Sequence, residues 1–186
     1  MPGGHLATAL ALSGVGYATT GSVEVSAGCF AGGFLIDCDH YLDYLVFEKQ
    51  WRRPGPASFL RYYFTHSLKK AVLPLHSAEL MTALLLLILV HPWPLLVGYW
   101  VGALMHLIFD VVVNGEQVLK RAVLFYFFAY RAANGFAAEK LLDLEVPTSP
   151  GDAPIREFFQ WRPNTGIRVE ACSENPLLLQ KVEPPN

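Results

Sequence analysis

The chain has 186 residues, of which 53% are apolar and only 16% are charged. Soluble domains carry about 25% charged residues, so this composition excludes a disordered chain, a coiled coil and a nucleic-acid-binding surface. The net charge is −2, and three cysteines are too few for a disulfide framework. The composition is typical of a membrane protein.

The N-terminal region predicts a helical hairpin. Between residues 5 and 36 the only charged side chain is Glu24, which follows a polar break at 19–22. The break leaves two apolar arms of about fifteen residues, which cross a bilayer only if the helices are short or tilted. Gly28 and Gly32 have the spacing that allows another helix to approach closely in lipid.

An acidic motif follows this hairpin directly. Residues 37–43 read Asp-Cys-Asp-His-Tyr-Leu-Asp. In a helix, Asp37 and His40 lie about 60° apart and share one face. Asp39 and Asp43 fit the same polar layer, but they also fit the solvated face of a following helix, and both interpretations stay open.

The longest apolar stretch predicts a transmembrane hairpin. Its arms, 71–90 and 94–113, hold 20 residues each and flank a Pro-Trp-Pro turn. Twenty helical residues rise about 30 Å, the thickness of the hydrocarbon core of a bilayer. Gly98 and Gly102 repeat the spacing of the small residues in the first hairpin. All 14 basic residues lie outside the two turns, so the positive-inside rule predicts that both chain ends lie on the cytoplasmic side of the membrane.

Four ionisable side chains interrupt this second hairpin, namely His76, Glu79, His106 and Asp110. Such groups cost about 2.5–3.5 kcal/mol when charged at the centre of a membrane helix, and they usually mark a function. Reflection of positions 76 and 79 through the turn gives positions 109 and 106, so the two pairs lie at one depth. In the first hairpin the same operation carries His5 to position 37. The pattern predicts one cytoplasmic layer of His and carboxylate groups.

The chemistry of this layer favours a metal. Imidazole and carboxylate groups without an organised cysteine set suit Zn²⁺, with Mn²⁺ or Fe²⁺ as alternatives. The predicted ligands are His5, Asp37, His40, Asp43, His76, His106 and Asp110. Metal-activated water attacking a phosphoryl or carbonyl centre is the simplest chemistry, with Glu79 or Asp39 as general base. The alternative is that these side chains only hydrogen-bond to one another and hold the helices together.

Two further segments follow the second hairpin. Residues 122–130 are aromatic and too short to span a membrane, and flanking basic residues favour an interfacial helix. Residues 141–186 hold seven of the 13 prolines, which predicts an extended tail that docks on the protein or on a partner. The predicted fold is therefore all-α. A polytopic bundle of about four membrane helices and an interfacial helix occupies residues 1–140, followed by this tail.

The ordered polar motifs resemble those of a known family. They comprise His5, the D-x-D-H-x-x-D motif at 37–43, His76-x-x-Glu79, the series Gly102, His106, Asp110 and Asn114, and an aromatic segment ending at Arg131. This order resembles the bacterial membrane-bound metal-dependent hydrolases. That family includes LexA-binding, inner-membrane-associated hydrolases and is distantly related to zinc-dependent phospholipase C and P1-type nucleases.

The resemblance covers roughly residues 5–140 and implies a multi-pass membrane hydrolase with a divalent metal. Two departures stand out. The family often has Pro before the first Asp, where this chain has Ile36. Of the frequent H-R-G-x-T-H-S motif, residues 61–67 keep only Thr65-His66-Ser67.

Two classes of function fit these observations. The first is a metal-dependent hydrolase at the cytoplasmic membrane surface, acting on a phosphoester of a lipid or related amphiphile. The second is a non-catalytic small subunit or scaffold of a larger membrane complex, bound through the tail and the aromatic segment. Membrane lipid is the expected partner in both classes, and nucleic acid in neither. Arg52, Arg53 and Arg61 fit either a phosphate headgroup site or a topology signal.

Overall fold

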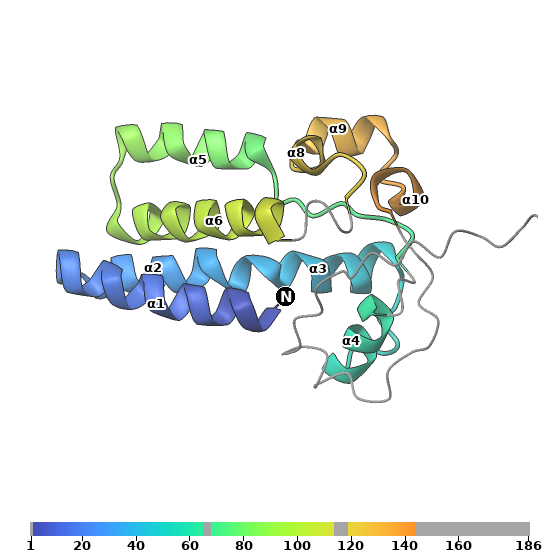
Figure 1. Ribbon diagram of the computed structural model, residues 1–186, viewed down its shortest axis with the longest axis horizontal. Helices are drawn as coiled ribbons and strands as arrows, with labels where there is room; N and C mark the ends of the chain where they lie inside the picture. The colour runs from blue at the N-terminus through green and yellow to red at the C-terminus, as the bar shows by residue number, and fades with distance from the viewer. Residues whose placement is uncertain (1, 65–67, 114–118, 144–186) are drawn as a thin grey trace, which may run out of the picture.

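The computed structural model describes residues 2–64, 68–113 and 119–143, and every named element within them is helical (Figure 1). The predicted all-α class is therefore confirmed. Helices α1 (Pro2–Thr20) and α2 (Val23–Gly33) form one hairpin, and α5 (Ala78–Val90) and α6 (Pro94–Val113) form another. The expectations for His66, Asn114 and the tail after Asp143 lie outside the described residues.

Shorter elements connect and follow the two hairpins. Between them lie η1 (Leu35–Asp37), α3 (Cys38–Leu42), η2 (Asp43–Phe47) and α4 (Pro56–Phe64). After the second hairpin come α8 (Ala122–Phe125), α9 (Phe128–Ala133) and α10 (Ala138–Leu141). The prediction of one helix over 122–130 was wrong, because the chain is extended at Phe127 and a new helix begins at Phe128.

The first arm of the second hairpin is shorter than predicted. The sequence predicts a helix from residue 71, whereas α5 begins at Ala78 and has 13 residues. Ser77 caps this helix by accepting a hydrogen bond from the Leu80 N–H at 3.1 Å. In the described part of the chain, only the stretch Pro94–Val112 is both long and apolar enough to cross a membrane. Helix α5 is apolar but shorter.

A seam of glycines joins α2 to α6, which lie side by side in Figure 1. A Cβ atom on Gly32 would lie 2.0 Å from the Tyr99 carbonyl oxygen, and one on Gly98 would lie 2.2 Å from the Val25 oxygen. A Cβ atom on Gly28 or on Gly102 would likewise lie only 2.3 Å from a carbonyl oxygen of the facing helix. The close approach expected from the small-residue spacing is thus confirmed. It brings the two helices into backbone contact.

Large apolar side chains remain exposed on the hairpins. Leu86, Leu89 and Val90 on α5, Trp93 in the turn and Val112 on α6 are all more than half exposed. An apolar surface of this extent marks contact with a membrane or with another protein. On α6, two of the polar side chains described next, His106 and Asp110, are buried instead.

Candidate metal centre

Histidine and aspartate side chains from both hairpins gather where α1 begins and α6 ends. We call this group the His–Asp cluster, and its members are His5, Asp37, His40, His76, His106 and Asp110. His5 comes from α1, Asp37 from η1 and His40 from α3. His76 lies in the segment before α5, and the last two residues lie on α6. Overlapping trios within this group, and a further trio of Asp39, His40 and His76, have ligand atoms within 4.8 Å of one another.

Hydrogen bonds fix the orientation of the two central imidazole rings. The Nδ1 atom of His106 lies 2.9 Å from the Gly33 carbonyl oxygen, which can only accept. The Nδ1 atom of His76 lies 3.0 Å from Asp39 Oδ2. Each Nδ1 can therefore donate in its contact, and each ring presents its Nε2 to the other ring. These two Nε2 atoms lie 3.2 Å apart, a distance that suits either a shared proton or a shared metal ion.

Two carboxylates lie close to the Nε2 atoms of His76 and His106. Asp37 Oδ1 lies 3.5 Å from His76 Nε2 and 3.3 Å from His106 Nε2. Asp110 Oδ2 lies 3.8 Å and 3.5 Å from the same two atoms. A tetrahedral zinc ion with bonds of about 2.0–2.2 Å would separate its ligand atoms by about 3.3–3.6 Å. A divalent ion would satisfy all four of these atoms at once, and protons on the two Nε2 atoms would do so through ion pairs with the carboxylates.

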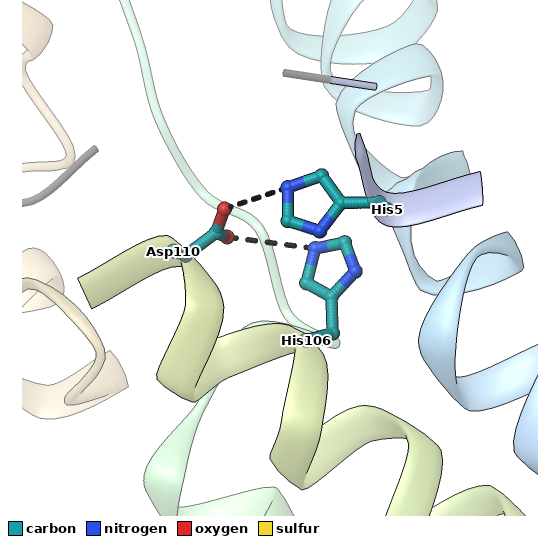
Figure 2. A group of neighbouring side chains, drawn as sticks. All are labelled: His5, His106 and Asp110. Carbon is teal, nitrogen blue, oxygen red and sulfur yellow. Dashed lines mark ion pairs between the residues drawn. The ribbon is translucent and has the colours of Figure 1, made fainter. Parts of the chain in front are cut away.

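The two remaining histidines contact the carboxylates. His5 Nε2 lies 3.1 Å from Asp110 Oδ1, and the His5 ring stacks on His106 with centroids 4.0 Å apart (Figure 2). His40 Nε2 lies 3.7 Å from Asp37 Oδ1. The Asp37 side chain is 30% exposed, while the side chains of His76 and His106 are buried. Solvent therefore reaches the cluster beside Asp37.

A row of carboxylates holds the backbone that carries His76. The sequence predicts two of them, Asp39 and Asp43, as site residues, but it indicates neither Glu48 nor a role in binding backbone. Asp39, Asp43 and Glu48 each accept two backbone N–H groups from the segment 69–76. The donors are Lys69 and Lys70 to Glu48, Val72 and Leu73 to Asp43, and Leu75 and His76 to Asp39, at 2.6–3.3 Å. We call this arrangement the carboxylate ladder. It holds the segment in a non-helical conformation, with a turn at residues 74–75, and explains why α5 begins late.

A π-turn places the three carboxylates of the ladder on one face. Asp39 and Asp43 are four residues apart, which is one α-helical turn. Glu48 follows Asp43 by five residues, and its N–H donates to the Asp43 carbonyl at 3.0 Å, the i to i+5 bond of a π-helix. The alternative that Asp39 and Asp43 begin a solvated face was wrong, since both are buried.

Asp39 orients His76 and does not itself reach the centre of the cluster. Burial works to raise the pKa of Asp39, but hydrogen bonds from the His76 ring and from the Leu75 N–H outweigh it and lower that pKa. The ionised carboxylate fixes the His76 tautomer, as the outer partners of metal-bound histidines commonly do. The buried Arg131 guanidinium donates to the His76 carbonyl oxygen at 3.1 Å and holds the same residue from the other side.

Three predicted site residues lie outside the cluster, namely Asp39, whose contact with His76 is described above, Asp43 and Glu79. Asp43 binds backbone N–H groups as part of the ladder. Glu79 is exposed, and its carboxylate accepts the N–H groups of Phe128 and Ala129 at 2.8 and 3.0 Å. Glu79 thereby caps the first turn of α9. In the described residues no contact joins Glu79 to the cluster, and its role as a general base stays a prediction.

Asp43 is expected to make stability depend on pH. Burial raises the pKa of its carboxyl to about 6, from an ordinary value of 3.8. Because the folded chain holds this proton to a higher pH than the unfolded chain does, the stability contributed by Asp43 falls as pH rises from about 4 to about 6. The melting temperature of Asp43→Asn should therefore depend less on pH across that range than the melting temperature of the wild type. Asp143→Asn, at an exposed position, is the control. An equal slope of melting temperature against pH in wild type and Asp43→Asn would contradict the prediction.

The fold and the cluster together define an all-helical protein with a candidate metal centre and one helix able to cross a membrane. No protein-family model, curated protein or solved structure matches this chain. Any functional assignment therefore rests on the chemistry of the cluster.

Proposed function

We propose that this protein is a membrane-bound, metal-dependent hydrolase whose His–Asp cluster holds a divalent ion. The observation that carries the proposal is the set of four inward-facing acceptor atoms on Asp37, His76, His106 and Asp110, spaced 3.2–3.8 Å in five measured pairs. Buried carboxylates and lone pairs without a cation are costly in a poorly solvated layer. The nitrogen and oxygen donors suit zinc best, with manganese and iron as alternatives.

The surrounding residues support hydrolytic chemistry at this centre. A divalent ion held there would polarise a phosphoryl oxygen and acidify water. Asp39 and the Gly33 carbonyl hold the two imidazoles in the required tautomers. Asp37 is the most exposed of the four central donors. We therefore propose its carboxylate as the group that accepts a proton from the attacking water, in place of Glu79.

The proposed location is the cytoplasmic face of a bacterial inner membrane, with a phosphoester of an amphiphile as substrate. Helix α6 has the length and composition of a span, and the outer faces of the hairpins are apolar. The cluster lies at the end of α6 away from the turn at Trp93, on the side where the basic residues lie.

Accessibility labelling tests this topology. In a cysteine-free background, single cysteines at Ser22 and Trp93 should react with an impermeant maleimide added to spheroplasts. A cysteine at Arg53 should react only after lysis, because the segment between the hairpins faces the cytoplasm. Labelling of the Arg53 position in intact spheroplasts would reverse the proposed orientation.

Metal analysis joined to an activity assay tests the reaction. Protein purified in detergent should hold a divalent metal and hydrolyse a chromogenic phosphoester. Chelation should abolish that activity, and Zn²⁺ should restore it. Asp37→Asn should lower kcat at least ~100-fold if this carboxylate accepts the proton. If the metal-loaded protein hydrolyses no phosphoester, the proposed hydrolase activity is wrong and only metal binding is supported.

One observation favours the alternative of a non-catalytic subunit. Four protein donors already close the tetrahedron, and closed coordination is typical of structural zinc sites. Cobalt substitution separates the two functions. A hydrolase should change its visible Co²⁺ spectrum when phosphate is added, because a coordination position opens beside Asp37. A structural site should show a tetrahedral spectrum that phosphate leaves unchanged.

A further inference from the structure

A pocket away from the cluster is lined by residues of η2, of α4 and of the chain between them. Helix α4 lies beside α3 in Figure 1. Its volume is about 430 Å³. The lining residues are Tyr44, Gln50, Arg53, Ala57, Ser58, Arg61 and Tyr62. None of them belongs to the His–Asp cluster, so the pocket needs an explanation of its own.

Two arginines from different segments line this pocket. Arg53 precedes α4 and Arg61 lies within it. In the part of the chain that the structure describes, no carboxylate lies within ion-pair distance of either guanidinium. Glu48 is close by, but its oxygens accept the Tyr62 hydroxyl at 2.7 Å and the backbone of the ladder. Among the described residues, the two guanidinium groups of the pocket therefore have no ion-pair partner.

The walls of the pocket are held by tyrosine side chains from α3 and η2. The Tyr44 hydroxyl donates to the Arg53 carbonyl oxygen at 2.7 Å, and the Tyr41 hydroxyl donates to the Pro54 carbonyl oxygen. From α4, the Phe59 ring packs against the rings of Tyr41 and Tyr44 at 5.4 and 5.5 Å. Both arginine-bearing segments are thus held in place before any ligand arrives, which lowers the cost of binding.

We propose that the pocket between Arg53 and Arg61 binds a phosphate group. Guanidinium forks match phosphate oxygens in pairs, and two forks from separate segments suit the several faces of a tetrahedral anion. The Ser58 hydroxyl lines the same space and can donate to a further oxygen. A lipid headgroup and a free phosphorylated compound share this chemistry.

Calorimetric titration of the full chain in detergent tests the pocket. The two probes are inorganic phosphate and short-chain dihexanoyl phosphatidic acid, each added separately. Arg53→Gln combined with Arg61→Gln should weaken binding at least ~tenfold, because charge-assisted hydrogen bonds are lost. The matched control is Arg52→Gln, whose guanidinium lies over the Trp51 ring at 4.9 Å and does not line the pocket. This control should bind like wild type.

The outcomes separate the source of the phosphate. Binding of inorganic phosphate indicates a free phosphorylated ligand, and binding of the lipid alone indicates a headgroup. Arg53→Lys with Arg61→Lys keeps both charges, preserves folding if the glutamines disturb it, and should bind more weakly than wild type. The proposal is overturned if neither probe binds, or if the glutamine pair or the lysine pair binds as wild type does. It is also overturned if Arg52→Gln weakens binding as much as the glutamine pair.

His106→Gln distinguishes this pocket from the metal centre. The substitution removes a central donor of the His–Asp cluster but touches no residue of the pocket. Phosphate binding should persist in this variant even where metal and hydrolysis are lost. If binding disappears in His106→Gln and survives in the glutamine pair, the phosphate belongs to the cluster and the pocket proposal fails.

Discussion

Replacing His106 with glutamine is expected to strip the metal from the purified protein and to lower its thermal stability. The variant loses the Nε2 donor at the centre of the cluster and the ring contact with the Gly33 carbonyl. Asp37 and Asp110 would then face each other without a cation in a poorly solvated layer. Because metal binding contributes directly to folding, the loss should amount to several kcal/mol. Elemental analysis and thermal unfolding in detergent measure the two effects.

His91→Gln is the matched control for this experiment. His91 is exposed at the end of α5 and lies outside the cluster, so its replacement should change neither metal content nor stability. Chelation of the wild type should reproduce the destabilisation seen in His106→Gln. If the chelated wild type unfolds at the same temperature as the untreated protein, protons hold the cluster together and the metal interpretation is wrong.

A single methyl group at Gly32 is expected to force α2 away from α6. The added Cβ would lie 2.0 Å from the Tyr99 carbonyl oxygen and 2.7 Å from the Ala103 nitrogen. Backbone atoms cannot move aside as a side chain does, so Gly32→Ala should destabilise by about 3 kcal/mol, the upper end for overpacking. It should also reduce metal content, because the neighbouring Gly33 carbonyl orients His106.

Gly14→Ala provides the comparison for Gly32→Ala. No atom lies within 4 Å of a Cβ at Gly14, which is in the middle of α1. This variant should gain up to ~1 kcal/mol through helix propensity. Equal unfolding temperatures for the two glycine variants would show that the seam is looser than the structure has it.

The turns of both hairpins could be predicted because their signals are local. Helix α1 ends at Thr20, and the Ser22 hydroxyl accepts from the Val25 N–H at 3.2 Å to start α2, inside the polar break. The non-helical segment 71–77 could not be predicted in this way. Its apolar residues fit a helix or a buried irregular chain equally well, and carboxylates 21 to 37 positions away decide between the two.

The depth of the site followed from the same turns, since helical rise is uniform on both sides of each hairpin. Reflection through the turns predicts His5 near position 37 and His76 near 106–110, and the structure gathers these side chains. It also predicts Glu79 at that depth, where the structure has a cap for α9. His76 and Glu79 share no helix face, because His76 lies before α5 begins.

The roles of two other residues could not be predicted from the sequence, for different reasons. Glu48 lies five positions after Asp43, a spacing that an α-helical period puts on another face and only the π-turn restores. Arg131 is fully buried, its guanidinium facing the rings of Phe125 and Phe128 at 5.3 and 5.8 Å. The sequence alone predicts an exposed side chain for a single arginine near a membrane surface. The carboxylates that surround Arg131 come from distant parts of the chain, so the local sequence does not indicate them.

The carboxylate ladder tolerates changes of length unequally on its two sides. A related chain lacking one residue within 44–47 would replace the π-turn with an ordinary α-turn, and acids spaced four and four would still share a face. One residue added within 71–75 would instead shift the non-helical backbone relative to the three carboxylates and move His76 out of line with His106. During divergence, the helical side of the ladder can lose a residue, whereas the segment that carries His76 must keep its length for the imidazoles to meet.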